Sequence, residues 1–384
     1  MTSRQRMLAA LSGQKPDCLP VTTHHIMPSY LARYEGGIMA EQFFDKYGFD
    51  AIDWTLPHAC GAAPGDRFDP AQGEPGFLQS RRIISDQWRI TEESLPQGPY
   101  QAVRYTVHTP GGQLTCTLES NEHTSWVTEH LIKEKRDIEL LARYQTAPLC
   151  DREAVEREAR RFGDRGIIRG HIPSSDIFGQ PGCWQDACCL YGTERLIMET
   201  YDDPQWVHEF LSILQARKLT YIRSLSGAPY DILELGGGDG CLSVISPAIF
   251  RTFVAPYDSV LIRAAHDAGQ RITYHLCGKL MGILEDVAAM EPDAVETFTP
   301  AGMGADADLA LARKLLGTRI CMIGGFDQYH FFTGCSEAAT RAEVRRCFDA
   351  TGGIGYILAP SDHFFEAEER LLHAFVDEAR RCIP

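Results

Sequence analysis

The sequence is short of positive charge. Lys and Arg together number 37 against 52 Asp and Glu, which gives a formal net charge of −15 at pH 7. No basic run stands out, with or without interleaved aromatic residues. Nucleic acid and anionic membrane surfaces repel a chain of this charge, so we expect neither as a partner. A polyanionic substrate is disfavoured for the same reason.

Long apolar runs are also missing. No stretch has the length and apolarity of a membrane span, and the residues after Met1 lack the apolar core of a signal peptide. Cysteine, by contrast, is frequent: 13 residues, an odd number, are scattered along the chain. We therefore expect a cytoplasmic protein with reduced thiols, and disulfide pairing is the alternative.

Short β-branched runs alternate with longer amphipathic stretches. Helical patterns cover 248–268, 307–316 and 337–351, and several end at Gly, as helices commonly do. This alternation predicts an α/β fold, a single (β/α)8 TIM barrel over residues 1–384. A doubly wound sheet is the alternative, but no glycine-rich dinucleotide motif follows the first run. The expected strands are residues 19–22, 51–54, 167–170, 231–234, 272–275, 294–297, 320–323 and 355–358.

The stretch from about 79 to 128 interrupts this alternation. Its strand-like runs, with Pro110-Gly111-Gly112 as a tight turn, predict an antiparallel β insertion after strand 2. Such an insertion would lie near the carboxyl-terminal mouth of the barrel, where it could cover a substrate or dock a partner. The expected runs are 83–90, 103–108, 113–118 and 126–128.

The end of the fifth expected strand reads Tyr274-His275-Leu276-Cys277-Gly278. Side chains alternate along a strand, so His275 and Cys277 point the same way and can converge on one ion. Nitrogen and sulfur are ligands that zinc prefers. A buried cysteine beside a hydrogen-bonded histidine is the structural alternative. Because barrel enzymes place their chemistry at the carboxyl ends of strands, we favour a zinc site.

Further ligands come from other strand ends. Glu234 lies on the adjacent fourth strand, and Asp362 follows the eighth and can reach across the barrel. His363 is another possible ligand, and Cys335 is a weaker one because it precedes a predicted helix. Residues 236–238, three glycines, favour a loop of close approach over a phosphate cradle, since no Lys-Ser/Thr follows them. We expect the pairs 331–332 and 364–365, all phenylalanine, to pack in the core.

A set of short motifs lies along the chain in a fixed order: residues 2–11, Lys15-Pro16-Asp17, Pro20-Val21, Ile245-Ser246-Pro247, Phe250, Pro256-Tyr257 and Tyr274 to Gly278. Together they resemble the uroporphyrinogen decarboxylase superfamily, across essentially the whole chain apart from the β insertion. That resemblance implies a (β/α)8 barrel with two functional branches. The decarboxylases bind their tetrapyrrole carboxylates with arginines after the first strand, and residues 21–27 contain no Arg, so decarboxylation is not expected.

The second branch comprises corrinoid-dependent methyltransferases, in which a His-x-Cys on the fifth strand and a Cys at the eighth hold zinc. Here Asp362 stands where that second Cys is expected. One sulfur with imidazole and carboxylate makes a more Lewis-acidic zinc than two sulfurs do, and such an ion suits an ether or phenolate oxygen better than a thiolate.

The resemblance therefore implies a zinc-dependent methyltransferase of the O-demethylase type. It would move a methyl group from an O-methyl substrate, an aromatic methyl ether, to the cob(I)alamin of a separate corrinoid protein. The expected zinc ligands are His275, Cys277, Asp362 and Glu234. The residues expected to assist proton movement are His330, His363 and Glu296. The residues expected to line the substrate are His24, His25, Trp54 and Tyr329.

Three other functions stay open. The first is a methylcobalamin:thiol or folate methyltransferase, which would catalyse the second half-reaction of such a system. The second is a tetrapyrrole decarboxylase, and the third is a non-catalytic protein that binds a corrinoid or a tetrapyrrole. For His24 and His25 a solvated loop pair is the alternative to a substrate site.

Overall fold

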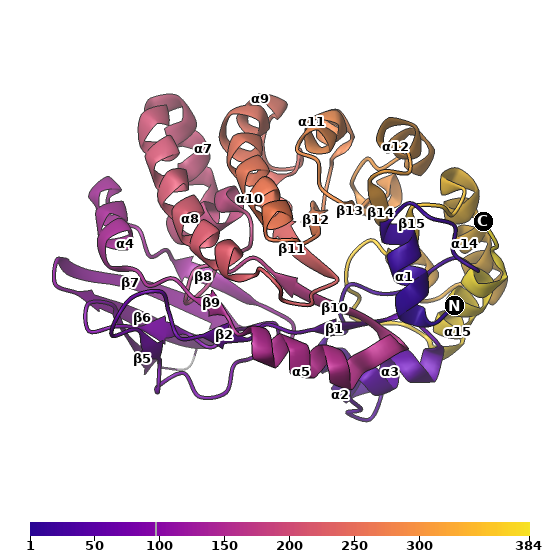
Figure 1. The fold of residues 1–384 in the computed structure, drawn as a ribbon, viewed down its shortest axis with the longest axis horizontal. Coiled ribbons are helices and arrows are strands. Elements are labelled where there is room, and N and C mark those ends of the chain that lie inside the picture. Colours follow the sequence, from indigo (N-terminus) through magenta and orange to yellow (C-terminus); the bar gives the residue numbers. More distant parts are fainter. Residues whose placement is uncertain (97) are drawn as a thin grey trace.

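Seven parallel strands form one curled sheet at the centre of the α/β fold (Figure 1). The structure, a computed structural model, describes residues 1–96 and 98–384. The strand order is β1-β10-β11-β12-β13-β14-β15, and these strands confirm seven of the eight predicted runs. Their bounds are β1 (Ala51–Trp54), β10 (Gly166–His171), β11 (Ile232–Gly236), β12 (Ile272–His275), β13 (Ala294–Thr297), β14 (Cys321–Phe326) and β15 (Tyr356–Pro360).

The first predicted strand, residues 19–22, is wrong as a regular strand. Only Val21 makes a β-bridge, to Leu358 of β15. Its carbonyl oxygen accepts a hydrogen bond of 2.7 Å from the backbone N of Asp50, just before β1. Pro20 has no N–H to donate, so the segment cannot form a full ladder. Val21 nevertheless lies between the two edge strands of the sheet, because it bonds to β15 and to the residue that precedes β1.

Helices follow most of the parallel strands and pack on the outer face of the sheet (Figure 1). The patterns at 307–316 and 337–351 are confirmed as helices, and their N-cap side chains, Asp308 and Ser336, accept backbone hydrogen bonds. The pattern at 248–268 is also helical, with a π-helical segment at Phe250–Val254. The helices are α1 (Ser3–Leu11), α2 (Pro28–Tyr34), α3 (Ala40–Tyr47), α4 (Ile138–Tyr144), α5 (Arg152–Phe162), α6 (Cys183–Tyr191), α7 (Thr193–Asp202), α8 (Pro204–Ser224), α9 (Pro247–Ile249), α10 (Ala255–Asp267), α11 (Leu284–Ala289), α12 (Leu309–Leu316), α13 (Gln328–Phe331), α14 (Glu337–Thr351) and α15 (Glu369–Arg381).

The inside of the curled sheet changes from apolar to polar along the strands. Near the amino ends, a core cluster contains Ile167 of β10, Ile232 of β11 and Ala294 of β13, packed against Met7 and other residues of α1. Two residues further along these strands come polar side chains on the same face, because side chains alternate with period two. These are Arg169, Glu234 and Glu296. The candidate site therefore lies on the carboxyl-terminal side of an apolar cluster inside the sheet.

An antiparallel sheet lies in the chain between β1 and β10, as the runs at 79–128 predicted. Its strand order is β5-β6-β7-β8, and Pro110-Gly111 forms the tight turn of the β6–β7 hairpin. The strands are β5 (Arg89–Ser94), β6 (Gln101–Thr109), β7 (Gly112–Ser120) and β8 (Ser125–Glu129). This sheet lies at the opposite side of the view from the two chain termini (Figure 1).

The prediction of a single strand at 83–90 is wrong, because the run is divided between two strands, β4 (Ile83–Ile84) and β5. A turn breaks it: the hydroxyl of Ser85 accepts hydrogen bonds from the backbone N of Gln87 and of Trp88. Ile83 and Ile84 instead pair with an earlier segment. The short pairs are β3 (Arg67–Phe68) with β4, and β2 (His58–Ala59) with β9 (Leu149–Cys150).

Among the described helices, none combines the length and apolarity needed to cross a bilayer.

Candidate metal centre

Side chains that can bind a metal converge at the carboxyl ends of the parallel strands. Three of them, which we call the triad, offer ligand atoms that all lie within 4.8 Å of one another: His275, Cys277 and Asp362. A second group with the same spacing, which we call the quartet, consists of His24, Glu234, His275 and Glu296. His275 belongs to both groups and joins them.

The triad joins two strand ends that are not neighbours in the sheet. His275 is the last residue of β12 and Cys277 follows two residues later, whereas Asp362 comes two residues after β15. The curl of the sheet brings them together. The Oδ1 atom of Asp362 accepts hydrogen bonds from the backbone N of His363 at 2.7 Å and from its Nδ1 at 3.0 Å. Burial opposes ionisation of Asp362, but the hydrogen bond from the His363 side chain and the charge of His275 hold its pKa well below the usual value.

The three glycines at the end of β11, residues 236–238, let the triad form. A Cβ on Gly238 would lie 2.8 Å from Sγ of Cys277, and one on Gly236 would lie 2.6 Å from the carbonyl oxygen of His275. Gly236 also has a φ of +102°, which side chains rarely adopt. The predicted loop of close approach at 236–238 is confirmed.

Arg169, a residue of β10, links the two carboxylates of the quartet. Its Nη1 donates a hydrogen bond of 3.0 Å to Oε2 of Glu296, and its Nη2 donates to both Glu234 and Glu296. Nε2 of His24 lies 2.8 Å from Oε2 of Glu234 and 3.4 Å from Oε1 of Glu296. The guanidinium also stacks on the ring of Trp54, with 4.5 Å between Cζ and the ring centroid.

Opposite charges keep the quartet ionised although it is buried. Burial disfavours the charged forms, but His24 and Arg169 outweigh it and lower the pKa of Glu234 to about 2. Glu296 shifts in the same direction for the same reason, Arg169 acting before His24. Burial likewise opposes protonation of His24, and the carboxylates of Glu234 and Glu296 outweigh it and raise its pKa. Carboxylates and cations therefore stabilise one another inside the sheet.

His275 uses one ring nitrogen within the quartet. Its Nδ1 lies 2.9 Å from Oε1 of Glu296. Because that carboxylate is ionised, Nδ1 is the donor to it, and Nε2 is the nitrogen whose lone pair becomes free when the ring loses a proton on metal binding. A carboxylate on the far side of a histidine is the usual partner of a metal-binding imidazole. Glu296 therefore holds the orientation and tautomer that His275 needs to bind a metal through Nε2.

The structure places the other predicted residues at different distances from this centre. Glu234 lies in the quartet and not in the triad. Trp54 donates its Nε1 hydrogen to the carbonyl oxygen of His24 at 2.8 Å. Nδ1 of His25 lies 2.6 Å from Nδ1 of His24, and the His25 ring stacks on His363. Both histidines thus belong to the centre, and the solvated loop pair is wrong.

Two predicted residues lie away from these groups. His330 bonds to Asp327 through Nδ1, and Tyr329, which is 72% exposed, packs on His330. Within residues 1–96 and 98–384, neither shares a hydrogen bond, ion pair or ring contact with the triad or the quartet. Cys335 also stays apart, since its thiol contacts the carbonyl oxygen of Phe331 and the hydroxyl of Thr340.

The match to a protein family covers the part of the chain that holds most of this centre. The family model described as uroporphyrinogen decarboxylase, URO-D, matches residues 152–382, more than half of the chain. The protein belongs to the uroporphyrinogen decarboxylase family. The predicted resemblance to this superfamily is thereby confirmed.

Curated uroporphyrinogen decarboxylases match shorter segments. The protein from Chlorobium phaeovibrioides is 30% identical over 128 residues, which are 33% of this chain and 34% of that protein. The protein from Bordetella parapertussis is 27% identical over 200 residues, 50% of this chain and 52% of that protein. The matches thus span about a third to a half of the length of these relatives.

A solved structure resembles the whole chain. The methyltransferase from Methanosarcina mazei superposes with a TM-score of 0.63 over 99% of both chains, at 15% sequence identity. At this identity the likeness shows a shared fold. The antiparallel sheet and the parallel sheet of this uroporphyrinogen decarboxylase family member are both included in that superposition, because it covers nearly the full length.

Sequence reasoning missed Arg169 in this family member. The residue lies in an apolar run, Ile167-Ile168-Arg169-Gly170, and its side chain is 1% exposed. A lone charge inside a buried strand is costly unless it is paired, and that mismatch is the signal that could have found it. Its two carboxylate partners lie 65 and 127 residues further along the chain.

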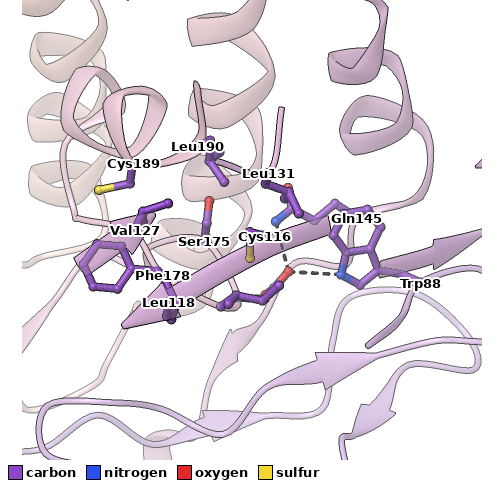
Figure 2. A pocket seen from close by; sticks show the side chains of 12 residues that line it. Trp88, Cys116, Leu118, Val127, Leu131, Gln145, Ser175, Phe178, Cys189 and Leu190 are labelled. Carbon is purple, nitrogen blue, oxygen red and sulfur yellow. Dashed lines mark hydrogen bonds between the residues drawn. The ribbon is translucent and has the colours of Figure 1, made fainter. Parts of the chain in front are cut away.

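Two other features of this family member lie outside the centre. Glu41, Asp53 and Glu158 form a third group of acidic ligand atoms, but Arg161 already pairs with all three. A mostly apolar cavity lies between the antiparallel sheet and α6 (Figure 2). There Asp176 accepts hydrogen bonds from Trp88 and Gln145, and the hydroxyl of Ser175 has no hydrogen-bond partner among the described residues. Neither feature includes a residue of the triad or quartet.

Proposed function

We propose that this protein is a zinc-dependent methyltransferase of the O-demethylase type. It would transfer a methyl group from an O-methyl substrate, an aromatic methyl ether, to the cob(I)alamin of a separate corrinoid protein. We propose that residues 1–384 act as one catalytic domain. In this domain the segment around Val21 would take the position of the eighth strand, between β15 and β1, and so complete the barrel. The Methanosarcina methyltransferase supports this through its shared fold.

The convergence of His275, Cys277 and Asp362 within 4.8 Å is the observation that carries the proposal. One imidazole, one thiolate and one carboxylate are ligands that zinc accepts, and three protein ligands leave a position open, as in catalytic zinc sites. The low pKa of Asp362 keeps the carboxylate in the form that binds metal. The donor set therefore fits zinc. Glu234 is the proposed fourth, replaceable ligand, although it pairs with His24 in the quartet.

Zinc bound by this donor set would act as a Lewis acid that stabilises negative charge on the departing oxygen. The residues behind the triad prepare it for that role. Arg169 neutralises Glu296, Glu296 holds Nδ1 of His275, and His275 presents Nε2. With one sulfur ligand, this donor set favours an oxygen leaving group over a thiolate acceptor.

A proton is needed where the methyl group leaves. The methyl group would leave without the electron pair of its bond to oxygen, and the corrinoid acceptor would supply the electron pair of the new bond. The oxygen therefore becomes an anion that takes up one proton. His363 is the best placed of the residues predicted to assist proton movement, because its Nδ1 is bonded to Asp362 and, in the protonated ring, its Nε2 carries the proton that the oxygen would take up. Glu296 is already engaged by His275 and Arg169, and His330 by Asp327.

Tetrapyrrole decarboxylation is the second candidate, and the curated relatives favour it. A substrate rich in carboxylates needs free cationic side chains. Arg169, the guanidinium of the centre, is already paired with two carboxylates, and residues 21–27 contain no Arg. Turnover of uroporphyrinogen by the metal-free protein would favour this candidate over methyl transfer.

Zinc content tests the proposal. We expect about one zinc per chain in the wild type, a large loss in Cys277→Ser and His275→Ala, and no change in the control Cys335→Ser. Elemental analysis of the purified proteins measures this. The zinc-loaded wild type should also convert cob(I)alamin to methylcob(III)alamin with a methoxylated aromatic compound, followed by absorbance. A wild type that binds no zinc, or an equal loss in Cys335→Ser, would overturn the site.

A further inference from the structure

Five rings form a continuous row beside the triad. We call them the ring row: Phe77, His25, His363, Phe365 and His123. Successive ring centroids lie 5.3, 5.0, 4.8 and 5.0 Å apart in that order. His25 stacks on His363 with an interplanar angle of 28°, and the other contacts are edge-to-face. These are the spacings of favourable aromatic pairs.

The ring row is assembled from segments far apart in the chain. Phe77 lies between β3 and β4, and His25 precedes α2. His363 and Phe365 follow β15, and His123 lies in the turn between β7 and β8. The antiparallel sheet therefore reaches the carboxyl ends of the parallel strands through its β7–β8 turn, and His123 contacts Phe365 there.

Both phenylalanines of the ring row leave much of their surface in solvent. Phe77 is 45% exposed and Phe365 43% exposed. For Phe365 the predicted core packing is wrong, whereas Phe364 and Phe332 are buried as expected. Exposed phenylalanine surface forgoes the burial that stabilises a core. Phe77 and Phe365 lie on either side of the His25–His363 pair in the ring row, and exposed rings in such a row mark a surface that another apolar group can cover.

The two middle rings of the ring row, His25 and His363, contact both polar groups. Nδ1 of His363 bonds to Asp362 of the triad at 3.0 Å, and Nδ1 of His25 lies 2.6 Å from Nδ1 of His24 of the quartet. A molecule whose reacting oxygen lies at the triad therefore has the rest of its body next to the rings. Flat faces and edges of phenyl and imidazole rings suit a planar aromatic body.

We propose that Phe77 and Phe365 bind the aromatic ring of the substrate and so determine its specificity, with His123 of the β7–β8 turn at the outer end of the site. The catalytic part of this inference rests on the proposed methyl transfer, but the binding part does not. The antiparallel sheet then has a function, because it supplies one wall of the substrate site.

Binding of 2-methoxyphenol to the zinc-loaded protein tests the inference by isothermal titration calorimetry, without cobalamin. We expect Phe77→Ala and Phe365→Ala each to weaken binding about tenfold, with zinc content unchanged. Binding of 2-methoxyethanol, an aliphatic methyl ether, should stay as in the wild type. Phe365→Leu should bind 2-methoxyphenol as weakly as Phe365→Ala, because it keeps apolar surface but loses the ring.

Tyr100→Ala is the matched control. Tyr100 is 44% exposed and packs edge-to-face on Trp126 of β8, so it is an equally exposed aromatic residue, just before β6 and outside the ring row. Wild-type affinity in Phe77→Ala and Phe365→Ala, an equal loss in Tyr100→Ala, or full affinity in Phe365→Leu would overturn the inference. Ring binding that depends on Phe77 and Phe365, in a protein that transfers no methyl group, would overturn the proposed reaction alone.

Discussion

His275 meets two kinds of neighbour through its two ring nitrogens. Nδ1 faces the carboxylate of Glu296, and Nε2 is left for the triad. Arg169 keeps Glu296 ionised inside the sheet, so the orientation of His275 depends on a charge two contacts away. At the scale of single residues, the quartet works as support for the triad.

Replacing Glu296 tests that support. We expect Glu296→Gln to lower the zinc affinity of the protein by about 10–100-fold, because a neutral amide holds the Nδ1 hydrogen of His275 less strongly. Competition with a chromogenic chelator measures the affinity. Glu343→Gln is the control, since Glu343 is also buried and paired with an arginine, Arg346, but lies on α14. Equal zinc affinity in Glu296→Gln and the wild type would show that Glu296 has no positioning role.

One buried carboxylate joins three elements beneath the centre. Asp258 of α10 accepts a hydrogen bond of 2.8 Å from the hydroxyl of Tyr274 in β12 and one of 3.3 Å from the backbone N of Cys183, the first residue of α6. Burial raises the pKa of Asp258 to about 6, and these hydrogen bonds reduce the shift without cancelling it. At the scale of elements, this contact couples the position of β12 to the helices outside it.

Asp258 gives the stability of the fold a defined pH dependence. Its pKa is about 6 in the folded protein and 3.8 ordinarily, so the folded state binds the proton more tightly than the unfolded state. The free energy of unfolding therefore falls as the pH rises from about 4 to about 6, and the contribution of Asp258 amounts to about 3 kcal/mol. Asp258→Asn should lack this contribution.

Urea unfolding at several pH values measures the effect as the difference between Asp258→Asn and the wild type. Asp349→Asn, at an exposed position of α14, is the control and should follow the wild-type curve. A difference between Asp258→Asn and the wild type that stays constant from pH 4 to 6 would contradict the prediction.

At the scale of the whole molecule, the two ends of the chain meet on Asp50, which is fully buried. Its carboxylate accepts hydrogen bonds from Arg6 of α1 at 2.7 Å and from Arg380 of α15 at 2.8 Å. The backbone N of Val21 donates to the same carboxylate at 2.9 Å. Asp50 thus holds the Val21 segment beside β1 and ties it to both terminal helices.

Removing that carboxylate should loosen the whole fold. We expect Asp50→Ala to lower the free energy of unfolding by about 3–5 kcal/mol, because two arginines and a backbone N–H lose a buried acceptor. Chemical denaturation measures this. Asp45→Ala is the control: its side chain is 64% exposed and 3.8 Å from Arg165, so its loss should stay below about 1 kcal/mol. A similar small loss in Asp50→Ala would contradict a closing role for Asp50.

The success of the sequence-based predictions depended on how local each feature is. Seven strands, three helical patterns and the turn at Pro110-Gly111 follow from periodicity and from turn or cap residues within a few positions. Residues 19–22 failed as a strand because Pro20 removes a donor, and the run at 83–90 failed because the side chain of Ser85 bonds the backbone of a turn.

The sequence by itself determined that His275 and Cys277 point the same way, because two residues of an extended segment share a face whatever surrounds them. Only the tertiary structure decided that Asp362 joins them, that Glu234 pairs with His24, and that Arg169 lies between two carboxylates. Only the tertiary structure decided the ring row as well. Such contacts link residues up to hundreds of positions apart, and the curl of the sheet, not local pattern, sets which strand ends face each other.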